Sequence, residues 1–137
     1  MASEQKLLIA QFIHNAWGKG RFNIVRQMVS RDFLFHASES MQSREFDDFA
    51  KEVEYLHSAI TDFDLAIEDI MVEGDRGISV MTICGTFNKP VFGFQPNNKL
   101  VGITCAITWT LQRGKVRHIN MMVDIAHLQR QLTVAVA

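Results

Sequence analysis

Three polar side chains near the end of the chain have the types and spacing for acid–base chemistry. His118, Asn120 and Asp124 lie at alternate positions of one predicted strand, so they project from the same face of a sheet. At the border of an apolar pocket, loss of water would raise the pKa of the Asp124 carboxyl toward the range useful for proton transfer. His118 would then orient or protonate a substrate oxygen, and Asn120 would donate to a developing oxyanion.

Each of these residues also has a structural interpretation, which the sequence leaves open. Asp124 stands between a predicted strand and a predicted helix, where aspartate is a common N-cap. A histidine near the open end of a strand, such as His118, is commonly only hydrogen-bonded or hydrated, and Asn120 would merely hold Asp124. His36, in an earlier aromatic strand, is a candidate for the rim of the same pocket.

The last two predicted strands, 101–111 and 115–124, form the hairpin that positions these residues. Arg113-Gly114 between them is typical of a tight two-residue turn. Residues equidistant from that turn then pair, and the polar residues share their face with apolar side chains: Ile103, Cys105, Ile107, Trp109 and Met122. The opposite face carries a mixed set: Thr104, Ala106, Thr108, Thr110, Arg117, Ile119, Met121 and Val123.

The remaining elements follow from hydrophobic periodicity. Apolar residues at helical spacing predict helices over 4–17, with Ser3 as N-cap, over 21–30, after Ser43 and after Asp124. Alternation predicts strands over 32–37, 64–73 and 78–87, followed by a loop over 88–99. Helices followed by a strand-rich half predict an α+β domain with a curved antiparallel sheet, and residues 1–137 form one domain.

The composition excludes several classes of partner. The 137 residues include 14 Lys and Arg and 15 Asp and Glu. This balanced charge does not indicate binding to nucleic acid or to an anionic membrane. The sequence contains neither a membrane-helix run nor signal-peptide features, so we expect a cytoplasmic protein. Cys84 and Cys105 alone cannot build a disulfide framework or a zinc site, and no metal site is expected. The balanced charge favours a small, neutral, apolar ligand.

A series of short motifs resembles the SnoaL-like polyketide cyclase family, within the nuclear-transport-factor-2-like superfamily. The matching residues run through most of the chain: Asp32–Ala37, Ile67-Glu68-Asp69-Ile70, Glu73-Gly74-Asp75-Arg76, Gly85-Thr86, Phe92-Gly93, Pro96, Lys99, Val101, Gly114-Lys115-Val116, Asp124, Leu128 and Gln131-Leu132. Two positions depart from the family pattern. Phe87 stands where the family usually has histidine, and Asn120 where a tryptophan is common.

The resemblance implies a cone-shaped sheet wrapped around N-terminal helices, in the nuclear-transport-factor-2-like (cystatin-like) architecture. It also implies a cofactor-free enzyme that closes a polyketide ring by intramolecular aldol condensation, with Asp124 in the position of the acid/base aspartate. Family members commonly dimerise, so we expect a homodimer through the outer sheet face. Under this hypothesis the pocket is shaped by Trp17, Phe33, His36, Phe87, Phe92, Ile103, Ile107, Trp109 and Met122.

The alternative hypothesis is a binding module without turnover, in which the same cone holds an apolar ligand or a protein partner. Fold alone does not decide between this module and an enzyme. Two related chemistries fit less well. A ketosteroid-isomerase mechanism needs a phenol near its carboxylate, and Tyr55, the single tyrosine, lies next to the buried stripe of a helix. An epoxide hydrolase of this superfamily needs an arginine between two acids, and Arg117 is predicted to face away from Asp124.

Overall fold

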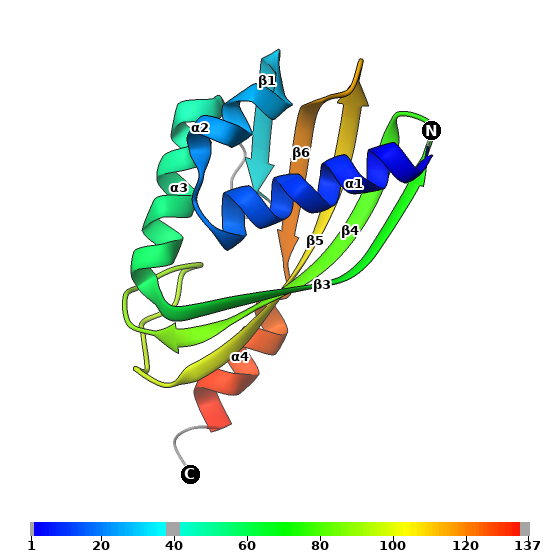
Figure 1. The fold of residues 1–137 in the computed structure, drawn as a ribbon. Helices are drawn as coiled ribbons and strands as arrows, with labels where there is room; N and C mark the ends of the chain where they lie inside the picture. Colours follow the sequence, from blue (N-terminus) through cyan, green and yellow to red (C-terminus); the bar gives the residue numbers. More distant parts are fainter. Residues whose placement is uncertain (1, 38–41, 135–137) are drawn as a thin grey trace.

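The chain folds around one curved six-stranded sheet, which a computed structural model describes for residues 2–37 and 42–134. Helices at the N-terminal end cover the concave face of this sheet, and the last helix lies beyond it on the other side (Figure 1). The helical segments are α1 (Ala2–Ile13), η1 (His14–Gly18), α2 (Phe22–Val25), η2 (Arg26–Met28), α3 (Phe46–Ala59) and α4 (Ile125–Val134). The strands are β1 (Val29–Ala37), β2 (Ser43–Arg44), β3 (Ile60–Glu73), β4 (Arg76–Phe87), β5 (Leu100–Gln112) and β6 (Lys115–Val123).

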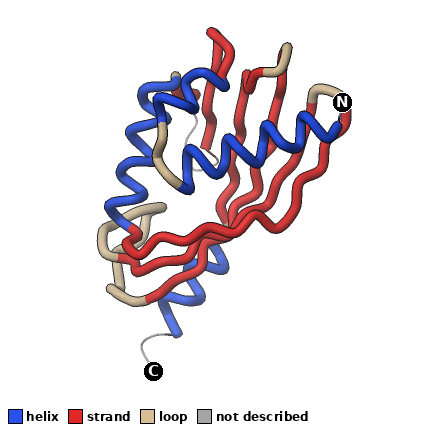
Figure 2. The backbone as a smooth tube through the Cα atoms, in the orientation of Figure 1, coloured by secondary structure: helices blue, strands red, loops and turns tan. Residues whose placement is uncertain are grey.

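The sheet has the strand order β2-β1-β6-β5-β4-β3 and stays open at both edges (Figure 2). The predicted α+β class and the curved sheet are confirmed. One pairing differs from the antiparallel arrangement that we expected, because β1 runs parallel to β6. A parallel pair needs a long crossover, and here α3, β3, β4 and β5 all lie between the two strands in the sequence.

The N-terminal helices bury the stripes that their periodicity predicts. Ile9, Phe12 and Ile13 of α1 are fully buried against the sheet, and α3 buries Phe49 and Val53 in the same core. Edge-to-face packing between aromatic rings joins the helices, as in the 5.4 Å contact between the rings of Trp17 and Phe49. None of the helices in the described ranges has both the length and the apolar character needed to cross a membrane.

Two predicted helix caps are wrong. Ser3 lies inside α1, which already begins at Ala2. Ser43 lies in the short strand β2, where it pairs with His36, and α3 begins only after Glu45. The predicted loop over 38–43 lies mostly outside the described residues, but its last residue, Ser43, belongs to β2 and extends the edge of the sheet.

The register between β5 and β6 differs from the predicted one. The turn is as expected, since Gln112 pairs with Lys115 around two residues with positive φ, and the next pair is also as predicted. The register then shifts by one residue, so that His118 pairs with Thr110 instead of opposing Trp109. The extra residue is Arg117, a β-bulge on β6.

This shift exchanges the two faces of β6, because neighbouring side chains of a strand point to opposite sides. Ile119 and Met121, which the predicted register places on the outer face, are buried beneath the helices. The predicted inward positions of His118, Asn120 and Met122 are wrong: these residues pair with Thr110, Thr108 and Ala106 on the outer face of the sheet.

Gly85 and Gly102 provide a matched test of this packing, since they occupy neighbouring strands of the sheet. A Cβ atom on Gly85 would lie 2.5 Å from Cγ2 of Ile60 and 2.6 Å from the backbone oxygen of Thr61. Gly85→Ala should therefore lower the free energy of unfolding by about 1–3 kcal/mol, measured by urea denaturation.

Gly102→Ala is the control, because its nearest atoms are 3.9 Å away, at ordinary contact distance. We expect its free energy of unfolding to change by less than about 0.5 kcal/mol, as for surface substitutions. Equal losses in the two variants would contradict the close packing of β4 against the start of β3.

Candidate functional site

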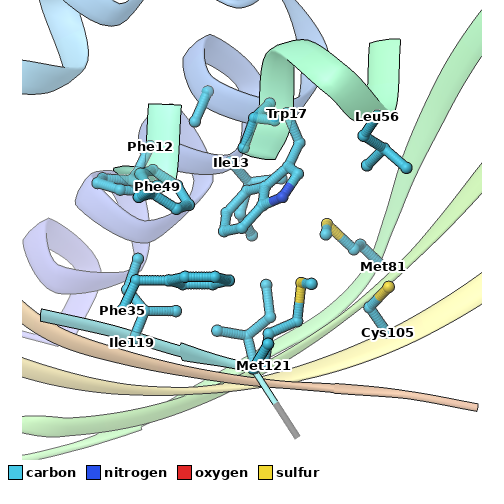
Figure 3. Packing of buried hydrophobic residues seen from close by; sticks show 14 of the residues in the cluster. Phe12, Ile13, Trp17, Phe35, Phe49, Leu56, Met81, Cys105, Ile119 and Met121 are labelled. Atoms are coloured by element: carbon cyan, nitrogen blue, oxygen red, sulfur yellow. The ribbon is translucent and has the colours of Figure 1, made fainter. Parts of the chain in front are cut away.

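An apolar cavity of about 580 Å³ lies between α3, the concave side of the sheet and the loop after β4. Its inner walls come from Trp17, Phe35, Val53, Leu56 and Met121, and its loop side comes from Val91, Phe92 and Gly93. In the close-up, Trp17 and Leu56 face Phe35, Met81 and Met121 across this interior (Figure 3). A mostly apolar hollow with a few polar groups is the usual form of a small-molecule site.

Trp17 is held over the cavity from two directions. It lies on the π-helix η1, which continues α1 and brings the indole against Phe49 and Phe12. Its backbone oxygen also accepts a hydrogen bond from Nε2 of His57, on α3. These contacts fix the side chain that separates the filled core from the open cavity.

The loop over 88–99 closes the opposite side through a tight turn. Val91 and Phe94 exchange two backbone hydrogen bonds around Phe92 and Gly93, which both have positive φ. This conformation is uncommon for a bulky residue such as Phe92 (φ 57°), and it presents the ring to the cavity. The hydroxyl of Tyr55 donates to the backbone oxygen of Pro90, which ties the loop to α3.

The polar groups of the cavity come from one flank of α3: Lys51, Glu52 and Tyr55. Glu52 is paired with Arg44 of β2, whose Nε lies 2.7 Å from Oε1 of the carboxylate. None of these three groups is among the site residues predicted from the sequence, which places Tyr55 only beside the buried stripe of a helix. A signal was present for Glu52, which lies three residues after Phe49 and four before Leu56, next to the buried stripe.

Of the side chains expected to shape a pocket, Trp17 and Phe92 line this cavity. Several others are packed into the core at 4% exposure or less, and the cavity lining does not include them: Phe33, Phe87, Ile103, Ile107 and Trp109. Trp109 also has a structural bond, since its Nε1 donates to the buried hydroxyl of Ser79 at 2.8 Å. The filled part of the cone is therefore larger than we expected.

His36, Asn120 and His118 lie together on the outer face of the sheet. The Nδ1–H of His36 donates to Oδ1 of Asn120 at 3.2 Å. Burial lowers the pKa of His118 below its usual value, and the charges of His36, Arg76 and Arg117 lower it further. These polar groups, like Met122, face away from the cavity.

Asp124 caps α4. Its Oδ1 accepts the backbone N–H of His127 at 3.1 Å, while its own N–H still pairs with the backbone oxygen of Thr104 on β5. The residue is exposed and is not part of the cavity lining. The N-cap interpretation is confirmed, whereas the desolvated surroundings expected of a catalytic carboxylate are not observed. An acid/base role for Asp124 stays a prediction.

Gln131, further along α4, holds this helix against β5. Its side-chain amide accepts from the N–H of Gly102 at 2.8 Å and donates to the oxygen of the same residue at 2.7 Å. Since β6 ends at Val123, these bonds satisfy backbone groups of β5 that the shorter strand cannot reach. Leu128, between the cap and this amide, is fully buried.

Two other hollows of similar volume lie at the surface. One, of about 570 Å³, is bordered by Lys6, Glu73 and Arg76 at the end of the β3–β4 hairpin. The other, of about 590 Å³, is lined largely by charged side chains near the start of α3. We favour the first cavity because its walls belong to the core. Within the described residues, no cluster of three His, Cys, Asp or Glu side chains is placed to hold a metal ion.

Comparison with known proteins gives a match to a protein family. The model of the SnoaL-like polyketide cyclase family matches residues 7–132, and no curated protein matches the chain in sequence.

Solved structures share the fold at low identity. A protein from Jannaschia sp. CCS1, assigned as a SnoaL-like polyketide cyclase, superposes with a TM-score of 0.81 at 17% identity, over 93% of this chain and 90% of its own. AclR from Streptomyces galilaeus, assigned as a hydroxylase, has a TM-score of 0.79 at 21% identity, over 97% and 83%. IdmH from Streptomyces antibioticus, assigned as a polyketide cyclase, has a TM-score of 0.77 at 17% identity, over 92% and 96%.

The cap at Asp124 leads to a stability prediction. Asp124→Ala removes the acceptor of the His127 N–H and should lower the free energy of unfolding by about 1 kcal/mol. Asp124→Asn keeps an acceptor at the same place and should change it by only a few tenths of a kcal/mol. Thermal and urea unfolding measure both variants, and equal losses would contradict the cap.

Proposed function

The chain belongs to the SnoaL-like polyketide cyclase family, and on that premise we propose that it binds one apolar, oxygen-bearing small molecule inside its cone. The cavity beneath Trp17 is the observation that supports this most directly. Its aromatic and aliphatic walls suit a flat ring system, while Glu52 and Tyr55 at one side suit a few oxygen substituents.

Cyclase or isomerase turnover is the second candidate, and the family match favours it. Turnover by Asp124 would require that carboxylate to leave its cap on α4 and reach the bound substrate, since it is exposed in the present arrangement. Ligand binding needs no such rearrangement. We therefore propose binding as the function that the geometry supports best, with proton transfer by Asp124 as the catalytic extension.

We also propose that a second copy of the chain covers the outer face of the sheet. Leu34, Ile78 and Met122 are large apolar side chains on three different strands of that face, each exposed by 38% or more. A two-fold dimer is the commonest way to cover such a surface. A cytoplasmic location and the absence of nucleic-acid partners stay predictions.

The binding proposal is tested with 2-methylanthraquinone, a flat apolar probe. The probe is titrated into the protein while the tryptophan fluorescence is measured, because Trp17 borders the cavity. Met121→Ala removes part of the cavity wall, so we expect about tenfold weaker binding, equivalent to about 1.4 kcal/mol. Met122→Ala is the control, since that side chain points outward, and its affinity should stay within about twofold of the unmodified protein. No binding, or equal losses in both variants, would contradict the proposal.

The dimer proposal is tested by sedimentation equilibrium. Ile78→Glu places a charge on the outer face and should convert a dimer into a monomer. Leu7→Glu, at an exposed apolar position of α1 instead of the sheet, should leave the dimer intact. A monomeric unmodified protein would overturn the proposal, as would a dimer that tolerates Ile78→Glu.

A further inference from the structure

We infer that Glu52 is the group that recognises the ligand in the cavity, that Arg44 holds it in place, and that the ligand presents a hydroxyl group to its carboxylate. This inference rests on the proposed function and adds a recognition chemistry to it. Glu52 combines three properties: it lines the cavity, it carries a charge, and an ion pair fixes its position.

Arg44 reaches Glu52 because of the pairing between β1 and β2. It lies directly opposite Phe35, so the two side chains project from the same face of the sheet. Phe35 forms part of the cavity wall, which brings the neighbouring guanidinium beside α3. The pair is partly shielded from water, since the two side chains are 26% and 38% exposed.

The ion pair with Glu52 does not account for every donor of the Arg44 guanidinium. Its Nη1 atom is buried, and within the described part of the chain no partner accepts a hydrogen bond from it. A buried donor without an acceptor is unfavourable, and native structures rarely keep one without a reason. An arginine held at this position despite that loss indicates a site organised around the Glu52 carboxylate.

The surrounding groups define what such a carboxylate would bind. An ionised carboxylate is an acceptor only, so its ligand partner must donate a hydrogen. The Tyr55 hydroxyl already donates to Pro90, and Lys51 is an exposed donor that suits an acceptor group. Apolar walls beside one fixed acceptor therefore select a ring system that carries a phenolic or enolic hydroxyl.

The test compares two probes of nearly equal size, 2-hydroxyanthraquinone and 2-methylanthraquinone, at a pH where the hydroxyl is protonated. We expect the unmodified protein to bind the hydroxyl probe at least about tenfold more tightly, as a hydrogen bond to a charged acceptor provides. Glu52→Gln should bring the two affinities within about twofold. Glu54→Gln, on the exposed side of the same helix, should keep the full preference.

Arg44 variants examine the positioning role. Arg44→Met should lose the preference for the hydroxyl probe while binding the methyl probe normally, and Arg44→Lys should restore part of it. The ratio of the two affinities is the readout, because a general loss of folding would weaken both probes together. A preference that survives Glu52→Gln, or that is absent from the unmodified protein, overturns the inference. Failure of the methyl probe as well would overturn the binding proposal itself.

Discussion

The β-bulge at Arg117 determines the chemistry of both faces of the sheet. Because β6 gains one residue after its turn, Ile119 and Met121 enter the concave side and His118 and Asn120 leave it. Without the bulge, imidazole and amide groups would lie beneath the helices, where their desolvation would be unfavourable. With it, the interior is apolar along the whole of β6, and the polar groups gather on the outer face.

The apolar interior is filled unevenly, and that unevenness creates the cavity. Aromatic rings from α1, η1, α3 and β1 pack against one another between the helices and the sheet, and the ring centroids of Phe35 and Phe49 are only 4.8 Å apart. This cluster of rings ends at Trp17. Beyond Trp17, the loop after β4 forms the opposite wall of the cavity. The same hydrophobic cluster therefore stabilises the fold at one end and leaves room at the other.

The sequence predicts the class of the fold and most of its elements, because periodicity depends on local neighbours. The sequence also identifies two residues that line the cavity: Trp17, from its place in a predicted helix, and Phe92, from its place in a loop motif. It fails where one residue shifts a register, since Arg117 carries no signal that separates a bulge from a regular strand. It misses Arg44 because its contact with Glu52 depends on a two-residue strand beside β1, which periodicity cannot detect.

The amide of Gln131 gives the family resemblance a physical meaning. The motif made by Asp124, Leu128 and Gln131 docks α4 on the end of β5, through a cap, a buried leucine and two bonds to Gly102. None of these three side chains lines the cavity. This part of the family resemblance thus corresponds to a contact between α4 and β5 that closes the architecture. Because this contact between α4 and β5 contributes no side chain to the cavity, these matching residues describe how the fold is closed and not which chemistry its interior performs.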